Sequence, residues 1–227
     1  MTSYRIVTFS AHAALFDLES SLIPALTKAL GPASSHVDLQ QVLKTWRDKQ
    51  LEYALISNSL QQGQTPFPHL TRRTLDYTLQ RFQMDVDASI RSDLVNAWKE
   101  LTPWPEVQEV LTEIKAQGYA IGLLSNSDEN TLQLLSGNFS ASFDYLFAAN
   151  QAGFYKPHPK IYHLPLVILK LTAHEVLHVT GSATDTFGAK AAGLACAWVN
   201  REEDVVLDAA YAPDFEIADL TGLLEIL

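Results

Sequence analysis

The stretch VLHVTGSATDTFGAKAAGLACAWV, residues 176–199, contains a complete strand–helix–strand unit. Residues 176–180 are short, apolar and rich in valine, which predicts a buried strand. Residues 184–192 predict a helix that Gly193 ends, and residues 195–199 predict the next strand. Strands that alternate with helices in this way favour a parallel sheet with helices on both faces.

The same alternation continues toward the N-terminus. Residues 4–9 predict a first buried strand, and the segments after residue 106 predict a helix over 107–115 capped by Gly118, a strand over 119–124 and a helix over 128–135. We therefore expect an α/β core of the Rossmann-like type.

A helical insertion separates the first strand from the rest of this core. Apolar residues recur at spacings of three and four from residue 39 to residue 55, which is typical of amphipathic helices. Pro103-Trp104-Pro105 marks the return, because proline lacks an N–H and restricts the residue before it. We expect a core of residues 1–17 and 100–227, a helical cap of residues 18–99, and an active cleft between them.

Composition excludes several classes of protein. The 227 residues carry a formal net charge of −10 with scattered Lys and Arg, so nucleic acid is not an expected partner. The single cysteine, Cys196, lies in an apolar run, which favours a buried filler over a reactive thiol. The N-terminus lacks the pattern of a signal peptide, and no apolar run reaches the roughly 18 residues of a membrane span. These features predict a soluble, cytoplasmic protein without membrane contact.

Polar residues follow the predicted strands at residues 10–14, 125–127 and 180–185, and a further polar loop covers residues 154–157. Reactive groups gather at the carboxyl ends of parallel strands, so these segments are expected to converge. In their order and spacing they resemble the motifs of the haloacid dehalogenase superfamily. Residues 46–53, WRDKQLEY, resemble the cap signature of its L-2-haloacid dehalogenase family, and the resemblance covers essentially the whole chain.

The first motif departs from this family. Members have a nucleophilic aspartate, a loop glycine and a threonine where this chain has Ser10, Ala13 and Ala14. A carboxylate that displaces halide forms an ester that water can hydrolyse, whereas serine would form an ether without a carbonyl. The resemblance therefore predicts a chain that neither dehalogenates nor dephosphorylates.

No metal or other cofactor is expected. The phosphatase branch of the superfamily uses a second acidic residue two positions after the nucleophile, where this chain has His12. Ser10 with His12 is a poor ligand set for a hard cation. The dehalogenase branch is metal-free, and its members are commonly homodimers, so the resemblance also implies a homodimer.

The resemblance assigns roles to the remaining motif residues. Arg47 matches the cap arginine near the substrate carboxylate and halide, and Lys156 matches the lysine that neutralises charge around the nucleophile. Asp185 matches the acid that helps activate water, and it could act as a base if burial raises its pKa. Substrate-binding positions of the family correspond here to Ser125, Asn126, Tyr162, Thr180 and Ser182.

Structural, non-catalytic interpretations stay open for several of these residues. Lys156 and Asp185 could form a structural pair, and Asp185 could be a first-turn acid of a helix. If residues 10–12 stay extended, Ser10 and His12 lie on the same side and could form a serine–base pair. Alternatively, the imidazole fills the space of an aromatic residue of the family.

The functional prediction is a repurposed enzyme that binds a small organic acid or carbonyl compound. His12, Asp185, Lys156 and Ser10 are the candidate catalytic residues, and the chemistry is non-covalent acid/base catalysis such as dehydration, cyclisation, isomerisation or hydrolysis. The alternative is a pseudoenzyme that binds a small anion or a partner without turnover. Retention of Arg47, Lys156 and Asp185 favours the enzyme, whereas Ala13 and Ala14 favour the pseudoenzyme.

Overall fold

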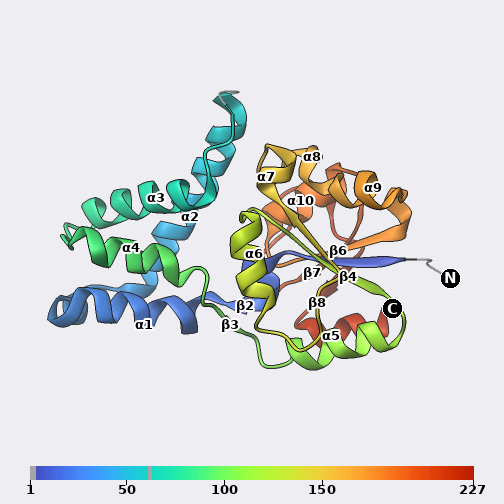
Figure 1. Cartoon of the computed structure of the whole chain (residues 1–227), viewed down its shortest axis with the longest axis horizontal. Coiled ribbons are helices and arrows are strands. Elements are labelled where there is room, and N and C mark those ends of the chain that lie inside the picture. Colours follow the sequence, from blue (N-terminus) through green and yellow to red (C-terminus); the bar gives the residue numbers. More distant parts are fainter. Residues whose placement is uncertain (1–3, 61–62) are drawn as a thin grey trace.

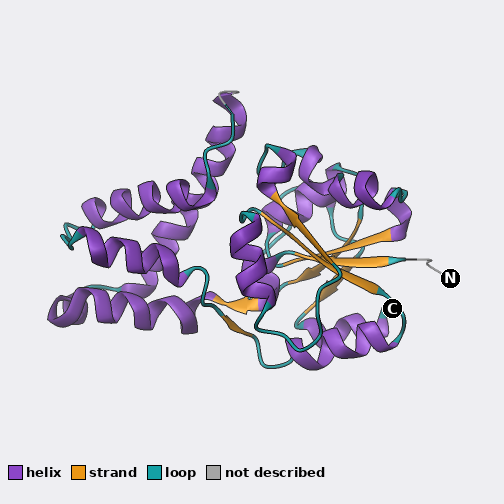
Figure 2. Ribbon diagram, in the orientation of Figure 1, coloured by secondary structure: helices purple, strands orange, loops and turns teal. Residues whose placement is uncertain are grey.

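The computed structural model describes residues 4–60 and 63–227, so residues 1–3 of the expected core and 61–62 of the expected cap lie outside it. Its centre is a sheet in which every neighbouring pair of strands is parallel (Figures 1 and 2). The expected α/β core is confirmed. Across the sheet the strands run β5 (Tyr145–Ala148), β4 (Ala120–Ser125), β1 (Ile6–Phe9), β6 (Val176–Thr180), β7 (Ala195–Val199) and β8 (Phe215–Ile217).

Helices cover both faces of the sheet (Figure 1). On one face lie α5 (Val107–Ala116) and the C-terminal 3₁₀ turn η5 (Leu220–Glu225), while α6 (Glu129–Ser136) packs on β4 and β5. The opposite face carries α7 (Ala149–Ala152), α8 (Pro159–Tyr162), α9 (Leu164–Leu169) and α10 (Ala183–Ala191). Two short 3₁₀ turns, η3 (Ala173–Glu175) and η4 (Ala209–Tyr211), complete the core.

Strand side chains alternate between these two faces because the period of a strand is two residues. Val7 and Phe9 belong to the hydrophobic cluster that includes α5, whereas Ile6 belongs to the cluster that includes Tyr162 of α8. Thr8 lies opposite His178 in the β1–β6 register. Both side chains therefore face α8 and α10.

Four long helices form a separate layer beside the core (Figure 1). They are α1 (Leu18–Leu30), α2 (Leu39–Leu60), α3 (Phe67–Arg81) and α4 (Ala88–Ala97), with the 3₁₀ turn η2 (Gly31–His36) after α1. A two-stranded antiparallel ribbon of β2 (Phe16–Asp17) and β3 (Thr102–Pro103) connects this layer to the sheet. No helix within residues 4–60 and 63–227 combines the length and hydropathy needed to cross a membrane.

Several local predictions were wrong in detail. The first strand begins at Ile6 rather than at residue 4. Residues 11–15 do not stay extended after Ser10 but form a π-helical turn, η1 (Ala11–Leu15). Ala11 and Ala14 are fully buried in this turn, where their small side chains allow neighbouring elements to pack closely.

Candidate active site

The candidate site lies where the carboxyl ends of β1, β4 and β6 meet. The chain runs from β1 to β4 and β5 on one side and then returns to β6, β7 and β8 on the other. Ser10 follows β1 at this reversal, and its backbone N–H donates to the carbonyl of Val179 at 2.9 Å. In open α/β sheets, the crevice at such a reversal is the usual place for a ligand.

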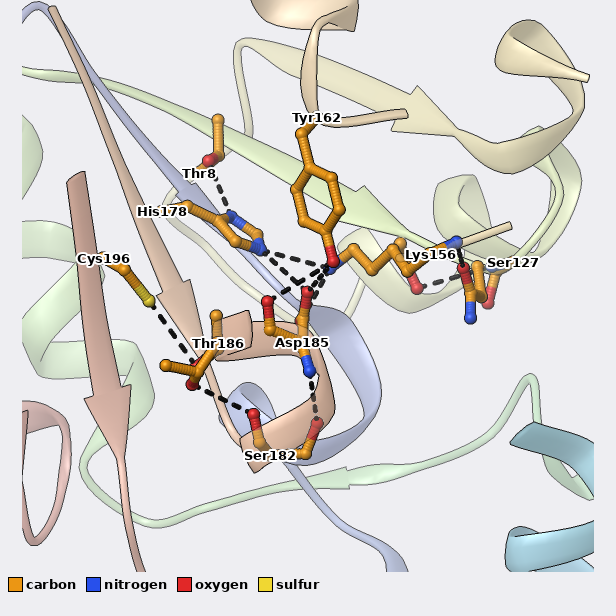
Figure 3. A network of polar contacts seen from close by, with 12 residues as sticks. Thr8, Ser127, Lys156, Tyr162, His178, Ser182, Asp185, Thr186 and Cys196 are labelled. Carbon is orange, nitrogen blue, oxygen red and sulfur yellow. Dashed lines mark hydrogen bonds and ion pairs between the residues drawn. The ribbon is translucent and has the colours of Figure 1, made fainter. Parts of the chain in front are cut away.

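A buried ion pair occupies the core side of the site (Figure 3). Lys156 Nζ lies 2.8 Å from Asp185 Oδ2, and the two residues are 8% and 6% exposed. The hydroxyl of Tyr162 donates to Asp185 Oδ1 at 2.8 Å. The structure thus brings together three of the predicted residues and shows the Lys156–Asp185 pairing that had been left open.

His178, which was not among the predicted site residues, joins this cluster. Its Nε2 lies 3.1 Å from Lys156 Nζ, and its Nδ1 lies 2.9 Å from the hydroxyl of Thr8 (Figure 3). Burial and the charge of Lys156 lower the pKa of His178, so the ring is neutral at pH 7. Nε2 then accepts from the ammonium and Nδ1–H donates to Thr8. A histidine inside the apolar strand 176–180 was the signal available in the sequence.

Asp185 has a lowered pKa, so the condition under which it could act as a base, a pKa raised by burial, is not met. Burial alone would raise the pKa of this carboxyl, but the nearby Lys156 and His178 outweigh burial and hold it well below its usual range. For Lys156, burial lowers the pKa and Asp185 opposes that shift. A carboxylate with this pKa that already accepts from Lys156 and Tyr162 is a weak proton acceptor.

Two glycines permit the close packing of these elements. A Cβ on Gly188 would lie 2.8 Å from Cζ of Tyr162, so glycine lets the phenol reach Asp185 across α10. A Cβ on Gly181 would lie 2.6 Å from the carbonyl oxygen of Ala13. The π-helical turn therefore rests directly on the backbone that follows β6.

His12 faces the cap rather than Ser10. Its ring stacks on Phe67 with centroids 5.6 Å apart at 14°, and it meets Trp98 edge-on at 5.4 Å. Its Nε2 lies 3.2 Å from the hydroxyl of Ser127. Within residues 4–60 and 63–227, no hydrogen bond joins Ser10 to His12, and the condition for a Ser10–His12 pair, an extended backbone over residues 10–12, is not met. Because η1 rotates the two side chains apart, their period-two alignment is lost.

The protonation state of His12 follows from its surroundings. The ring is only 2% exposed. Burial, with smaller contributions from the charges of Arg47 and Lys156, lowers its pKa well below the ordinary value. The imidazole is therefore neutral at pH 7. Its unprotonated nitrogen can accept a proton, but the lowered pKa means that the ring holds this proton only briefly.

Arg47 lies on the cap side of the site. Its Cζ is 5.7 Å from the centroid of the Trp98 ring, and it donates to the side chain of Gln50. In the described part of the chain, no carboxylate lies within 4.0 Å of the guanidinium. Burial lowers the pKa of Arg47 to about 10, opposed by attraction to Asp185 and Asp48, so the group stays charged at pH 7.

The remaining predicted residues mostly hold the backbone. Ser125 Oγ accepts from the N–H of Ser127 at 3.4 Å, and Asn126 Oδ1 accepts from the N–H of Lys156 at 2.7 Å. Ser182 caps α10 and accepts from the N–H of Asp185 at 3.3 Å, which also makes Asp185 a first-turn acid.

Thr180 does not join the group that surrounds Asp185. Its side chain is fully buried, and its hydroxyl lies 2.7 Å from the hydroxyl of Thr186 in α10. Across the described ranges, no three His, Cys, Asp or Glu side chains are grouped closely enough to hold a metal ion. Cys196 is fully buried, and burial raises the pKa of its thiol to about 12.

Known proteins resemble this chain over almost its entire length. The (S)-2-haloacid dehalogenase of Pseudomonas sp. (strain YL) is 29% identical over 222 residues, which cover 97% of this chain and 93% of that protein. The (S)-2-haloacid dehalogenase of Xanthobacter autotrophicus is 33% identical over 199 residues, covering 87% and 75%. Among solved structures, an L-2-haloacid dehalogenase superposes with a TM-score of 0.90 at 25% identity and covers 99% of each chain.

A family model for haloacid dehalogenase-like hydrolases matches residues 12–193. The matched span includes the cap helices, the Lys156 loop, β6 and α10. The fold, the site at the strand ends and these similarities lead to one conclusion: the chain belongs to the haloacid dehalogenase-like hydrolase family.

Proposed function

We propose that this protein binds a small organic acid or carbonyl compound at the junction of core and cap and acts on it by non-covalent acid/base chemistry instead of dehalogenation. Ser10 carries the first part of this proposal. By the resemblance it stands in place of the aspartate whose ester the dehalogenase cycle requires, and a serine ether offers water no carbonyl to attack.

The charge balance of the site supports an anionic ligand. Lys156 and Asp185 neutralise each other at 2.8 Å, and the neutral His178 and Tyr162 complete their hydrogen bonds. Arg47 has no such partner among the described carboxylates. The site therefore has one uncompensated positive charge, which fits a monocarboxylate, and a guanidinium fork suits its two oxygens. The relatives are named (S)-2-haloacid dehalogenases, and a 2-haloacid carries a carboxylate of this kind.

His12 is the group best suited to move a proton. It is neutral, and its pKa responds to the charge of Arg47, so the two side chains share one electrostatic environment. Asp185 and Lys156 form an ion pair with each other and hold the side chains on the core side of the site in place. Dehydration, cyclisation, isomerisation and hydrolysis all remain compatible with one neutral base beside a bound carboxylate.

Ligand binding tests the proposal without knowledge of the reaction. A panel of 2-hydroxy and 2-halo acids is titrated while tryptophan emission is followed, because Arg47 lies over the Trp98 ring. We expect saturable binding that weakens roughly 10- to 100-fold in Arg47→Ala, the loss of one charge-assisted contact. Lys44→Ala is the matched control: it removes a charge from the same helix, at an exposed residue paired with Asp48. Equal binding by wild type and Arg47→Ala would refute the proposal.

The alternative is a pseudoenzyme that binds the anion without turnover. Asp185 favours this alternative, because its carboxylate already accepts hydrogen bonds from Lys156 and Tyr162. His12→Phe separates the two, because it keeps an aromatic ring against Phe67 and Trp98 and removes the titratable group. Lost turnover with retained binding supports the enzyme, whereas binding without turnover in the wild type supports the pseudoenzyme.

A further inference from the structure

The hydrogen bond between Ser127 and His12 brings together two groups that can perform chemistry of their own. Ser127 Oγ lies 3.2 Å from His12 Nε2, and the residues are 0% and 2% exposed. Within the described chain, no other side chain hydrogen-bonds to the His12 ring. A hydroxyl within reach of a neutral imidazole is the arrangement that activates a serine nucleophile.

Ser127 occupies a favourable place in the chain for this role. It lies in the turn between β4 and α6, so a strand precedes it and a helix follows it. The first backbone N–H groups of α6 have no intrahelical acceptors, and the Asp128 side chain takes only that of Thr131. Donors of this kind, next to a nucleophile, stabilise the negative oxygen that forms when a carbonyl is attacked.

The cap fixes the orientation of the base. Phe67 stacks on one face of the His12 ring and Trp98 meets the ring edge-on, so the imidazole has little freedom to rotate. Lowered basicity keeps His12 neutral at pH 7 and so able to accept the hydroxyl proton. Arg47 lies over the same Trp98 ring, with its Cζ 5.7 Å from the ring centroid.

We propose that Ser127 and His12 form a nucleophile–base pair that hydrolyses esters or thioesters of small carboxylic acids, with a free carboxylate of the substrate bound by Arg47. Ser127 Oγ bonds to the acyl carbon while its proton passes to His12 Nε2, and the departing alkoxide or thiolate takes that proton. Water then attacks the acyl carbon and gives a proton to His12, which returns it to Ser127 as the acid is released. The Arg47 contact rests on the function proposed above; the covalent step goes beyond it.

Two chromogenic esters test the pair and the carboxylate contact separately. 4-Nitrophenyl hydrogen succinate carries a free carboxylate, and 4-nitrophenyl butyrate is its neutral counterpart. We expect faster nitrophenol release from the former, a succinyl adduct on the peptide containing Ser127 after acid quenching, and at least a tenfold loss in Ser127→Ala and in His12→Phe. Ser92→Ala is the control, because this exposed hydroxyl bonds only to its own helix. Wild-type release no faster than that of Ser127→Ala would overturn the proposal.

A thiol at the same position gives a second readout that needs no substrate. In Ser127→Cys the native Cys196 stays silent, since it is buried and its thiol pKa is raised to about 12. We expect iodoacetamide to alkylate the introduced thiol at pH 7, at least tenfold more slowly when His12→Phe is added. No alkylation, or no effect of His12→Phe, would overturn the nucleophile–base pair. Carboxylate binding that persists in such a case would leave the Arg47 proposal standing, so the two failures are distinguishable.

Discussion

Replacing Lys156 by methionine should leave Asp185 as a buried charge without its cation. The side chains of the pair are only 7% and 8% exposed, so solvent screens their interaction weakly. Removing one partner of a buried ion pair costs about 3–5 kcal/mol, because the other charge stays desolvated. For a chain of this size each kcal/mol corresponds to roughly 2–4 °C, so we expect the Tm of Lys156→Met to fall by roughly 6–20 °C at pH 7.

The pH dependence of this loss has a definite sign. In the wild type, the folded pKa of Asp185 lies below its unfolded value of about 3.9, so its contribution is present above that pH and is lost as pH falls toward the folded pKa. In Lys156→Met, burial dominates and raises the carboxyl pKa. Protonation then relieves the penalty, so the deficit relative to wild type shrinks as pH falls from 7 to 4. His178, freed from the Lys156 charge, would protonate more readily and act in the same direction.

Thermal unfolding followed by circular dichroism at pH 7, 6, 5 and 4 measures both effects. The double variant Lys156→Met/Asp185→Asn removes both charges and should recover much of the loss at pH 7, because no uncompensated carboxylate remains. A Tm that falls by less than 2 °C in Lys156→Met, or a deficit that grows as pH falls, would refute the assignment of a charged, mutually dependent pair.

Two further predictions concern Ser10 and His178. The purified protein should release no chloride from L-2-chloropropionate, as measured by ion chromatography. Ser10→Asp should restore little chloride release, because Ala13 and Ala14 also depart from the family loop. Chloride release that depends on Ser10 would contradict the argument that serine forms an ether. His178→Phe should lower the free energy of unfolding in urea by about 1–3 kcal/mol, since the Lys156 ammonium loses an acceptor. His178→Gln can present an oxygen near the position of Nε2 and should lose less. Equal losses in the two variants would assign His178 to packing alone.

The order of elements could be predicted from the sequence because it depends on local periodicity. The strand–helix–strand pattern of residues 176–199 was correct in type and order, and both strand ranges, 176–180 and 195–199, match the structure. The helical insertion was visible from its spacing of three and four. The edge strands β5 and β8 were missed, since they are short and only partly buried and so leave a weak apolar pattern.

The convergence of the site segments was also predictable, because parallel strands bring their carboxyl ends to one edge. Lys156 and Asp185 were identified from the motifs that contain them. Their state was not: whether burial or a neighbouring cation controls the pKa of a carboxyl depends on distances of a few ångströms between elements far apart in the chain. Only the tertiary structure, which places the Lys156 loop against α10, decided it.

The contacts of His12 and His178 show the same division between what the sequence predicts and what only the tertiary structure decides. Residue types in the sequence determined that a histidine follows the first strand and that another lies within β6. A π-helical turn, allowed by the small residues of η1 and by Gly181, turned His12 from Ser10 toward Ser127 and the cap rings. Pairing of β1 with β6 put the Thr8 hydroxyl 2.9 Å from Nδ1 of His178. Backbone conformation over a few residues and strand register are collective properties of the fold, and only the tertiary structure could decide which side chains meet.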